Sequence, residues 1–261
     1  MNTARIWSVI NSLALIIVLI VNGMANALPI NGKTTGEISD SYPNLFTPAG
    51  FTFGIWGLIY LALLGFIIYQ LVMAWKPNRN AVFITRIGPF FLVSCVANAA
   101  WIFAWHYEII WLSWLIMLLL LGSLVLAYQR LEIGRSTVEP GRQWLVHVPF
   151  SLYLGWITIA TIANTTILLT DLGWDAFGVD PRIWSIVVLW AGVSIAYRVW
   201  QVRRDLVFIL TIGWAYSGIV MQRLDVSGGL SDTVAIGAAA GILLILIMAI
   251  SQVVSGRDAA T

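Results

Sequence analysis

Long apolar runs alternate with short polar segments along almost the whole chain. A run of about 17 to 25 apolar residues is long enough to cross the hydrocarbon core of a bilayer as a helix. In lipid such a run must satisfy its own backbone hydrogen bonds, which favours helices throughout. The pattern therefore predicts an all-α, polytopic transmembrane helix bundle with about eight spans. They are residues 9–27, 51–74, 87–105, 109–128, 145–169, 183–199, 206–221 and 234–254.

Composition agrees with a membrane environment. Hydrophobic residues make up 60% of the chain and charged residues 10%, with a mean hydropathy of +0.89. Soluble domains carry about 25% charged residues. We expect a multi-pass integral membrane protein whose main surroundings are the lipid bilayer. The formal net charge of +2 is too small to indicate a nucleic-acid partner.

Lysine and arginine residues predict the orientation, because cytoplasmic segments of membrane proteins carry an excess of them. With the N-terminus in the cytoplasm, the outer loops hold only Lys33, Arg182 and Arg223. We therefore expect both termini in the cytoplasm and the protein in the cytoplasmic, or inner, membrane. The basic residues of the inner segments are Arg5, Lys76, Arg79, Arg86, Arg130, Arg135, Arg142, Arg198, Arg203, Arg204 and Arg257.

The start of the chain has an alternative interpretation. Arg5, the apolar run 13–21 and the small residues 25–27 also match a signal peptide with its cleavage site. We expect a retained first span, and cleavage stays the alternative.

Several kinds of chemistry are disfavoured by where the ionisable residues fall. Every Asp and Glu lies in a loop or at a helix end, whereas ion and proton pathways place such residues within spans. The two lysines, Lys33 and Lys76, lie outside the membrane interior, which excludes a retinal Schiff base. His106 and His147 fall at opposite ends of the bundle, so we expect packing rather than a shared metal site. The single Cys95 excludes a disulfide framework.

The 14 tryptophans are the most distinctive feature of the interior. Those near span ends are typical of the aromatic belt at the membrane surface. Others form stripes at helical spacing, each along one face of a span. The stripes are Phe53, Trp56 and Tyr60 in the second span, Asn98, Trp101 and Trp105 in the third, and Tyr153, Trp156 and Asn164 in the fifth.

Depth counting places the three stripes at the same level. At about 1.5 Å per residue, Trp56 lies about 8 Å below the outer surface, and Trp101 and Asn164 lie about 6 and 8 Å below it. All three stripes converge beneath the long first outer loop, residues 28–50. Aromatic walls with a few polar groups are typical of sites for flat apolar ligands. The alternative is that the stripes serve only helix packing, with asparagine as interhelical glue.

Three segments resemble the tryptophan-rich sensory protein family, TspO, also called the translocator protein family. They are 46–60 (FTPAGFTFGIWGLIY), 98–101 (NAAW) and 148–164. The resemblance covers about the first 170 residues. It implies a TspO-like five-helix bundle at 1–170, followed by three additional transmembrane helices at 171–261.

The resemblance also implies a ligand. Members of this family bind porphyrins, haem or sterol-like molecules between helices, for transport, sensing or turnover. No cofactor is required, and porphyrin or haem is the expected ligand class. Pro48-Ala49 departs from the family's paired prolines and leaves the ligand's identity open. By position, the resemblance implies as pocket residues Trp56, Trp101, Trp156, Asn98 and Asn164, with Phe51, Phe53, Tyr60 and Pro149 in support. The predicted ligand-binding residues are Phe51, Phe53, Trp56, Tyr60, Asn98, Trp101, Trp105, Tyr153, Trp156 and Asn164.

Other functions remain open at this point. A membrane carrier or a scaffold would need no such pocket. An enzyme would have to use tryptophan-dependent photo-oxidation of a porphyrin, because the chain offers no acid–base or metal set; we predict no catalytic or metal-binding residues. A homodimer is a further alternative.

Overall fold

Hydrophobic runs become long helices throughout the computed structural model, which describes residues 3–28, 30–77, 81–227 and 232–258. Eight helices within these residues are long and apolar enough to cross a membrane, as predicted. No strand occurs among them. The long helices are α1 (Thr3–Ala27), α3 (Ile55–Trp75), α4 (Val82–His106), α5 (Ile110–Arg130), α7 (Val148–Asp171), α8 (Pro181–Arg203), α9 (Leu206–Ser227) and α10 (Thr233–Asp258).

Short elements lie between them. The first loop contains the 3₁₀ turns η1 (Ile30–Gly32) and η2 (Gly50–Gly54) and the helix α2 (Thr35–Asp40). A turn α6 (Pro140–Arg142) and a π-helical turn η3 (Gln143–His147) precede α7, and η4 (Ala176–Gly178) precedes α8.

The predicted sixth and seventh spans are too short. In the structure α8 and α9 have 23 and 22 residues. Their extra turns contain Arg203, Arg223 and Asp225, which hydropathy alone assigns to loops. A helix can continue past its apolar stretch because long polar side chains reach toward the membrane surface.

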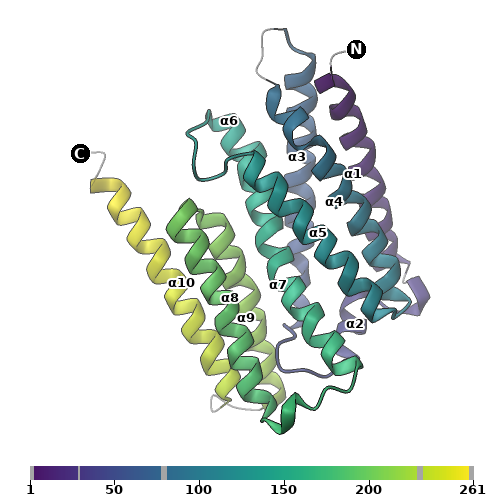
Figure 1. Ribbon diagram of the computed structural model, residues 1–261, viewed down its shortest axis with the longest axis vertical. Helices are drawn as coiled ribbons and strands as arrows, with labels where there is room; N and C mark the ends of the chain where they lie inside the picture. Colours follow the sequence, from purple (N-terminus) through teal and green to yellow (C-terminus); the bar gives the residue numbers. More distant parts are fainter. Residues whose placement is uncertain (1–2, 29, 78–80, 228–231, 259–261) are drawn as a thin grey trace.

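Helix α7 connects two groups of helices (Figure 1). It packs against α5 on one side, where α1, α3, α4 and α5 lie, and against α9 on the other, where α8 and α10 lie. In the span that contains α7, 78% of an 18-residue apolar stretch is buried inside the protein. In the corresponding stretches of the other long helices the buried share is 28 to 56%. The interior of the bundle therefore centres on α7.

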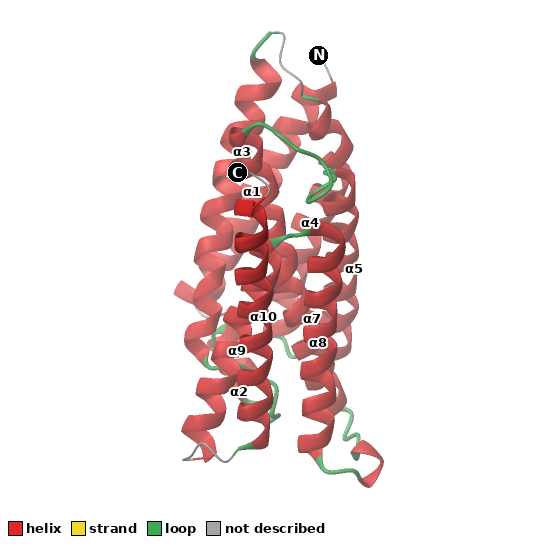
Figure 2. Ribbon diagram, turned by 90° about the vertical axis from the view of Figure 1, so that its left-hand side faces the viewer, coloured by secondary structure: helices red, strands yellow, loops and turns green. Residues whose placement is uncertain are grey.

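The long helices run side by side, with the connections gathered at the two ends (Figure 2). Both termini lie toward one end, and α2 and the first loop lie at the other (Figure 1). We call the end with α2 and the first loop the loop end, and the end with both termini the terminal end. The assignment of the terminal end to the cytoplasm stays a prediction from the charge pattern.

A buried polar network joins the two groups of helices at the terminal end. Asp205, between α8 and α9, is only 7% exposed. Its Oδ2 accepts hydrogen bonds from the Tyr128 hydroxyl (2.8 Å) and the Ser151 hydroxyl (2.6 Å). Its Oδ1 accepts from the backbone N–H of Phe208 (3.1 Å) and so caps α9. The sequence correctly places Asp205 between two helices, but only the structure reveals that it is buried.

Candidate functional site: an aromatic cluster between α3 and α7

Five aromatic side chains meet between α3 and α7, and we call them the aromatic cluster. Trp56 stacks on Tyr60, with ring centroids 5.3 Å apart. Its edge contacts Tyr153 and Trp156 at 6.0 and 6.1 Å. Phe53 contacts Trp156 at 5.9 Å. These stacked and edge-to-face geometries are the favoured ones for aromatic pairs.

Local structure explains why the rings meet. Trp56 and Tyr60 are four residues apart on α3, and Tyr153 and Trp156 are three apart on α7, so each pair shares a helix face. Phe53 comes from η2, the 3₁₀ turn that leads directly into α3. The contact between α3 and α7 brings the two faces together.

Two asparagines hold one side of the cluster. The Asn98 amide on α4 donates to the Tyr153 hydroxyl at 2.9 Å. Asn22 on α1 donates to the Asn98 side-chain oxygen at 2.7 Å. Asn98 was among the predicted site residues, whereas Asn22 was not. Its position late in an apolar run was the available signal, but an asparagine there fits a signal peptide equally well.

Two indole N–H groups are buried without a hydrogen-bond partner, that of Trp156 in the cluster and that of Trp101 on α4, three residues after Asn98. The buried Tyr60 hydroxyl lies beside the Asn98 side chain. Buried polar groups in proteins normally have partners. The two indole N–H groups are therefore available to a bound molecule that offers acceptors.

The remaining predicted residues lie outside the cluster. Trp101 and Trp105 stack on each other on α4, and the Trp105 indole donates to the Thr35 carbonyl of α2. Asn164 accepts a hydrogen bond from Ser113 of α5 at 3.4 Å. The structure thus joins Phe53, Trp56, Tyr60, Asn98, Tyr153 and Trp156 by direct contacts, and leaves four predicted residues apart.

Phe51 is one of those four, and it points elsewhere. It is 51% exposed and contacts the Trp214 ring of α9 edge-on at 5.6 Å. Pro149 is buried seven residues before Trp156 on α7, toward the terminal end. Neither residue contributes a contact to the cluster.

The first loop folds against the end of α4. The two ring nitrogens of the buried His106 lie 3.0 Å from the Ile30 carbonyl and 3.2 Å from the Thr35 hydroxyl. Asn31 donates to the His106 carbonyl at 3.0 Å. These bonds hold η1 and α2 at the loop end, and they give His106 the packing role expected from the sequence.

A second attachment of the loop depends on charge. Lys33 pairs with Glu108 at 2.7 Å, and the Tyr42 hydroxyl donates to the same carboxylate at 3.2 Å. The hydrogen bond from Lys33 holds the pKa of Glu108 below its ordinary value of 4.5. Burial, and then the bond to Glu108, raises the pKa of Tyr42 to about 12.

This attachment predicts a pH dependence for the loop. Because the pKa of Glu108 is lowered in the folded protein, its stabilising contribution is present above 4.5 and is lost as the pH falls through the lowered pKa. We expect amide-exchange protection factors of residues 30–42 to fall below about pH 4. Glu37 also has a lowered pKa, from its bonds to Thr34. Glu108→Gln is therefore the control: it should lower protection already at neutral pH and reduce the acid-dependent loss. An unchanged acid transition in this variant would contradict the assignment.

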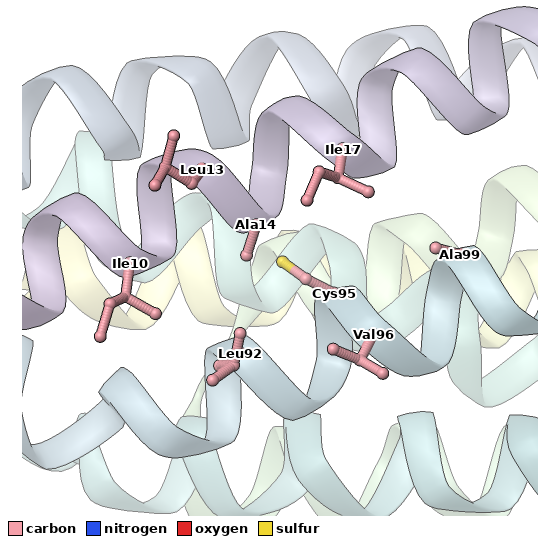
Figure 3. Close-up of a pocket in the computed structure, with 8 residues that line it drawn as sticks. All are labelled: Ile10, Leu13, Ala14, Ile17, Leu92, Cys95, Val96 and Ala99. Carbon is pink, nitrogen blue, oxygen red and sulfur yellow. The ribbon is translucent and has the colours of Figure 1, made fainter.

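An apolar groove lies between α1 and α4 (Figure 3). Its volume is about 400 Å³. The Cys95 sulfur points toward Ala14 within it, while Leu13 and Val96 are 57 and 60% exposed at its rim. The groove is open at this rim and is a second candidate place for an apolar molecule. Its lining is Ile10, Leu13, Ala14, Ile17, Leu92, Cys95, Val96 and Ala99.

The described residues contain no group of three or more His, Cys, Asp or Glu side chains arranged to hold a metal ion. His106 closes α4 at the loop end, whereas His147 lies in η3 at the terminal end.

Comparison with known proteins identifies a family. No curated protein and no solved structure matches the chain. The model of the family described as TSPO-like protein matches residues 8–251, a stretch that begins within α1 and ends within α10. The division at residue 170 stays a prediction. Since the match covers nearly the whole chain, this protein belongs to the TSPO-like protein family.

Proposed function

We propose that this protein binds a flat apolar ligand of the porphyrin or haem class at the aromatic cluster. The observation that carries the proposal is the convergence of five rings from η2, α3 and α7, together with the buried indole N–H groups of Trp156 and Trp101, which have no hydrogen-bond partner. Aromatic faces bind a planar ring system by stacking, and the free donors suit its nitrogen or carboxylate acceptors. Family membership supports the same ligand class.

The rings of the cluster now contact one another, so a ligand has to displace at least one of them. Trp56 and Phe53 are half-buried, whereas Trp156 and Tyr153 are buried. We therefore propose that the ligand enters from the Trp56 side, separates Trp56 from Trp156 and stacks between them. Binding is the step that transport, sensing and turnover have in common, and it is the activity proposed. The charge pattern supports the cytoplasmic membrane as its location.

The test is a titration of the purified protein in detergent with protoporphyrin IX, followed by the Soret absorbance of the porphyrin. Trp156→Leu removes the central ring and its N–H, and we expect affinity to fall about tenfold or more, since a lost stacking contact and its buried area are worth 1.4 kcal/mol or more. Ala99→Phe fills the groove between α1 and α4 and should change affinity less than about twofold.

Each outcome has a defined meaning. Loss of affinity in Ala99→Phe but not in Trp156→Leu would place the ligand in the groove and contradict the proposed site. Absence of any porphyrin-induced Soret shift with the wild type would reject the proposed function.

A further inference from the structure

Helix α9 holds the backbone of η2, the turn that carries Phe53 and leads to Trp56. The Trp214 indole N–H donates to the Thr52 carbonyl at 3.1 Å. The Ala49 N–H donates to the Gly218 carbonyl at 3.0 Å. These bonds connect residues more than 160 positions apart in the sequence. A 3₁₀ turn is short and has poor internal hydrogen-bond geometry, so outside partners can determine where it lies.

The approach of α9 to η2 is very close. The Thr52 side chain is fully buried, and a Cβ at Gly218 would lie 1.9 Å from its hydroxyl oxygen. Only glycine leaves room for this contact. The edge-on contact between Phe51 and Trp214 lies beside it. This explains why Phe51 faces α9 rather than the cluster.

The same helix also touches the opposite wall of the cluster. A Cβ at Gly155 of α7 would lie 2.9 Å from the Thr211 Cβ and 3.0 Å from the Phe208 carbonyl oxygen. Gly155 immediately precedes Trp156. Helix α9 therefore contacts both η2, which carries Phe53, and the turn of α7 that carries Trp156.

We infer that α9 sets the spacing of the aromatic cluster, with Trp214 and Gly218 as positioning residues for the ligand site. This inference rests on the proposed function and gives one of the three C-terminal helices a role in it. Trp214 acts on η2 through its hydrogen bond to the Thr52 carbonyl. Weakening its bond should let η2 move and should alter the gap between Trp56 and Trp156.

The test compares two single substitutions. Trp214→Phe removes the indole N–H and keeps an aromatic ring beside Phe51, at a position that is 41% exposed and so tolerant of change. Trp184→Phe is the matched control, because its indole also donates to a backbone carbonyl, that of Ala176, at 3.0 Å. That bond joins α8 to η4 and does not involve the cluster. Both proteins are examined at full length in detergent.

Two measurements are made on each variant: hydrogen exchange of the amides in residues 49–56, and the dissociation constant for protoporphyrin IX. Trp214→Phe should speed the exchange and weaken porphyrin binding about three- to tenfold. Trp184→Phe should change neither. The melting temperatures of both variants distinguish local movement from a general loss of stability. We expect the two variants to melt at the same temperature and to differ in porphyrin affinity.

Unchanged exchange in Trp214→Phe would overturn the inference, as would faster exchange with unchanged porphyrin affinity. An equal loss of affinity in both variants would show a nonspecific effect and would also overturn it. If the wild type binds no porphyrin, the proposed function fails, and the exchange measurement alone then decides whether α9 positions η2.

Discussion

Replacement of Asp205 by alanine is expected to lower the free energy of unfolding by about 3 to 7 kcal/mol. The substitution removes the N-cap of α9 and leaves the Tyr128 and Ser151 hydroxyls without their acceptor in a buried site. Each buried polar group that loses its partner costs about 1 to 3 kcal/mol, and a lost cap about 1 kcal/mol. Titration with SDS in detergent micelles, with helix content followed by circular dichroism, measures the loss.

Asp180→Ala is the matched control for Asp205. Asp180 caps α8 in the same way, through the N–H of Arg182 at 2.8 Å, but it is exposed and has no buried partners. Its loss should cost about 1 kcal/mol. Equal destabilisation by the two substitutions would mean that Asp205 acts only as a cap, and that the bonds to α5 and α7 add nothing.

Gly155→Val is expected to destabilise the protein by about 1 to 3 kcal/mol and to weaken porphyrin binding as well. The new side chain would collide with Thr211 and with the backbone of α9 at Phe208, neither of which is a flexible chain end. To relieve the collision, α9 must move away from α7 beside Trp156. The same SDS titration and the Soret titration measure the two effects.

Gly122→Val serves as the comparison, because a Cβ at Gly122 of α5 meets nothing within 4 Å. It should leave the stability unchanged to within a few tenths of a kcal/mol, because nothing blocks the new side chain and glycine is a poorer helix former than valine. If Gly155→Val is no more harmful than Gly122→Val, the contact between α7 and α9 is not as tight as the structure indicates.

Hydropathy was sufficient to predict the helices, because in lipid a long apolar run has few alternatives to a helix. It was insufficient at the ends of α8 and α9, where Arg203 and Arg223 continue the helix beyond the apolar stretch. Helical spacing likewise predicted that Trp56 shares a helix face with Tyr60 and that Tyr153 shares one with Trp156. Spacing within a helix follows from its geometry.

Contacts between helices could not be predicted in the same way. Asn98 and Trp105 belong to the same stripe on α4, but Asn98 bonds to the cluster and Trp105 bonds to the first loop. Spacing along one helix does not show which residue of a stripe meets which neighbour. The burial of Asp205 depends on the relative placement of α5, α7 and α9. The bond between Trp214 and Thr52 joins distant segments, and neither residue carries a local signal of the other.

The central claim is that a flat apolar ligand lies between Trp56 and Trp156. The most direct measurement is an experimental structure of the protein with protoporphyrin IX bound. The account predicts ligand density between α3 and α7, with Trp56 and Trp156 moved apart and their rings against the porphyrin. Density in the groove between α1 and α4, beside Cys95, with the aromatic cluster unchanged, would contradict it.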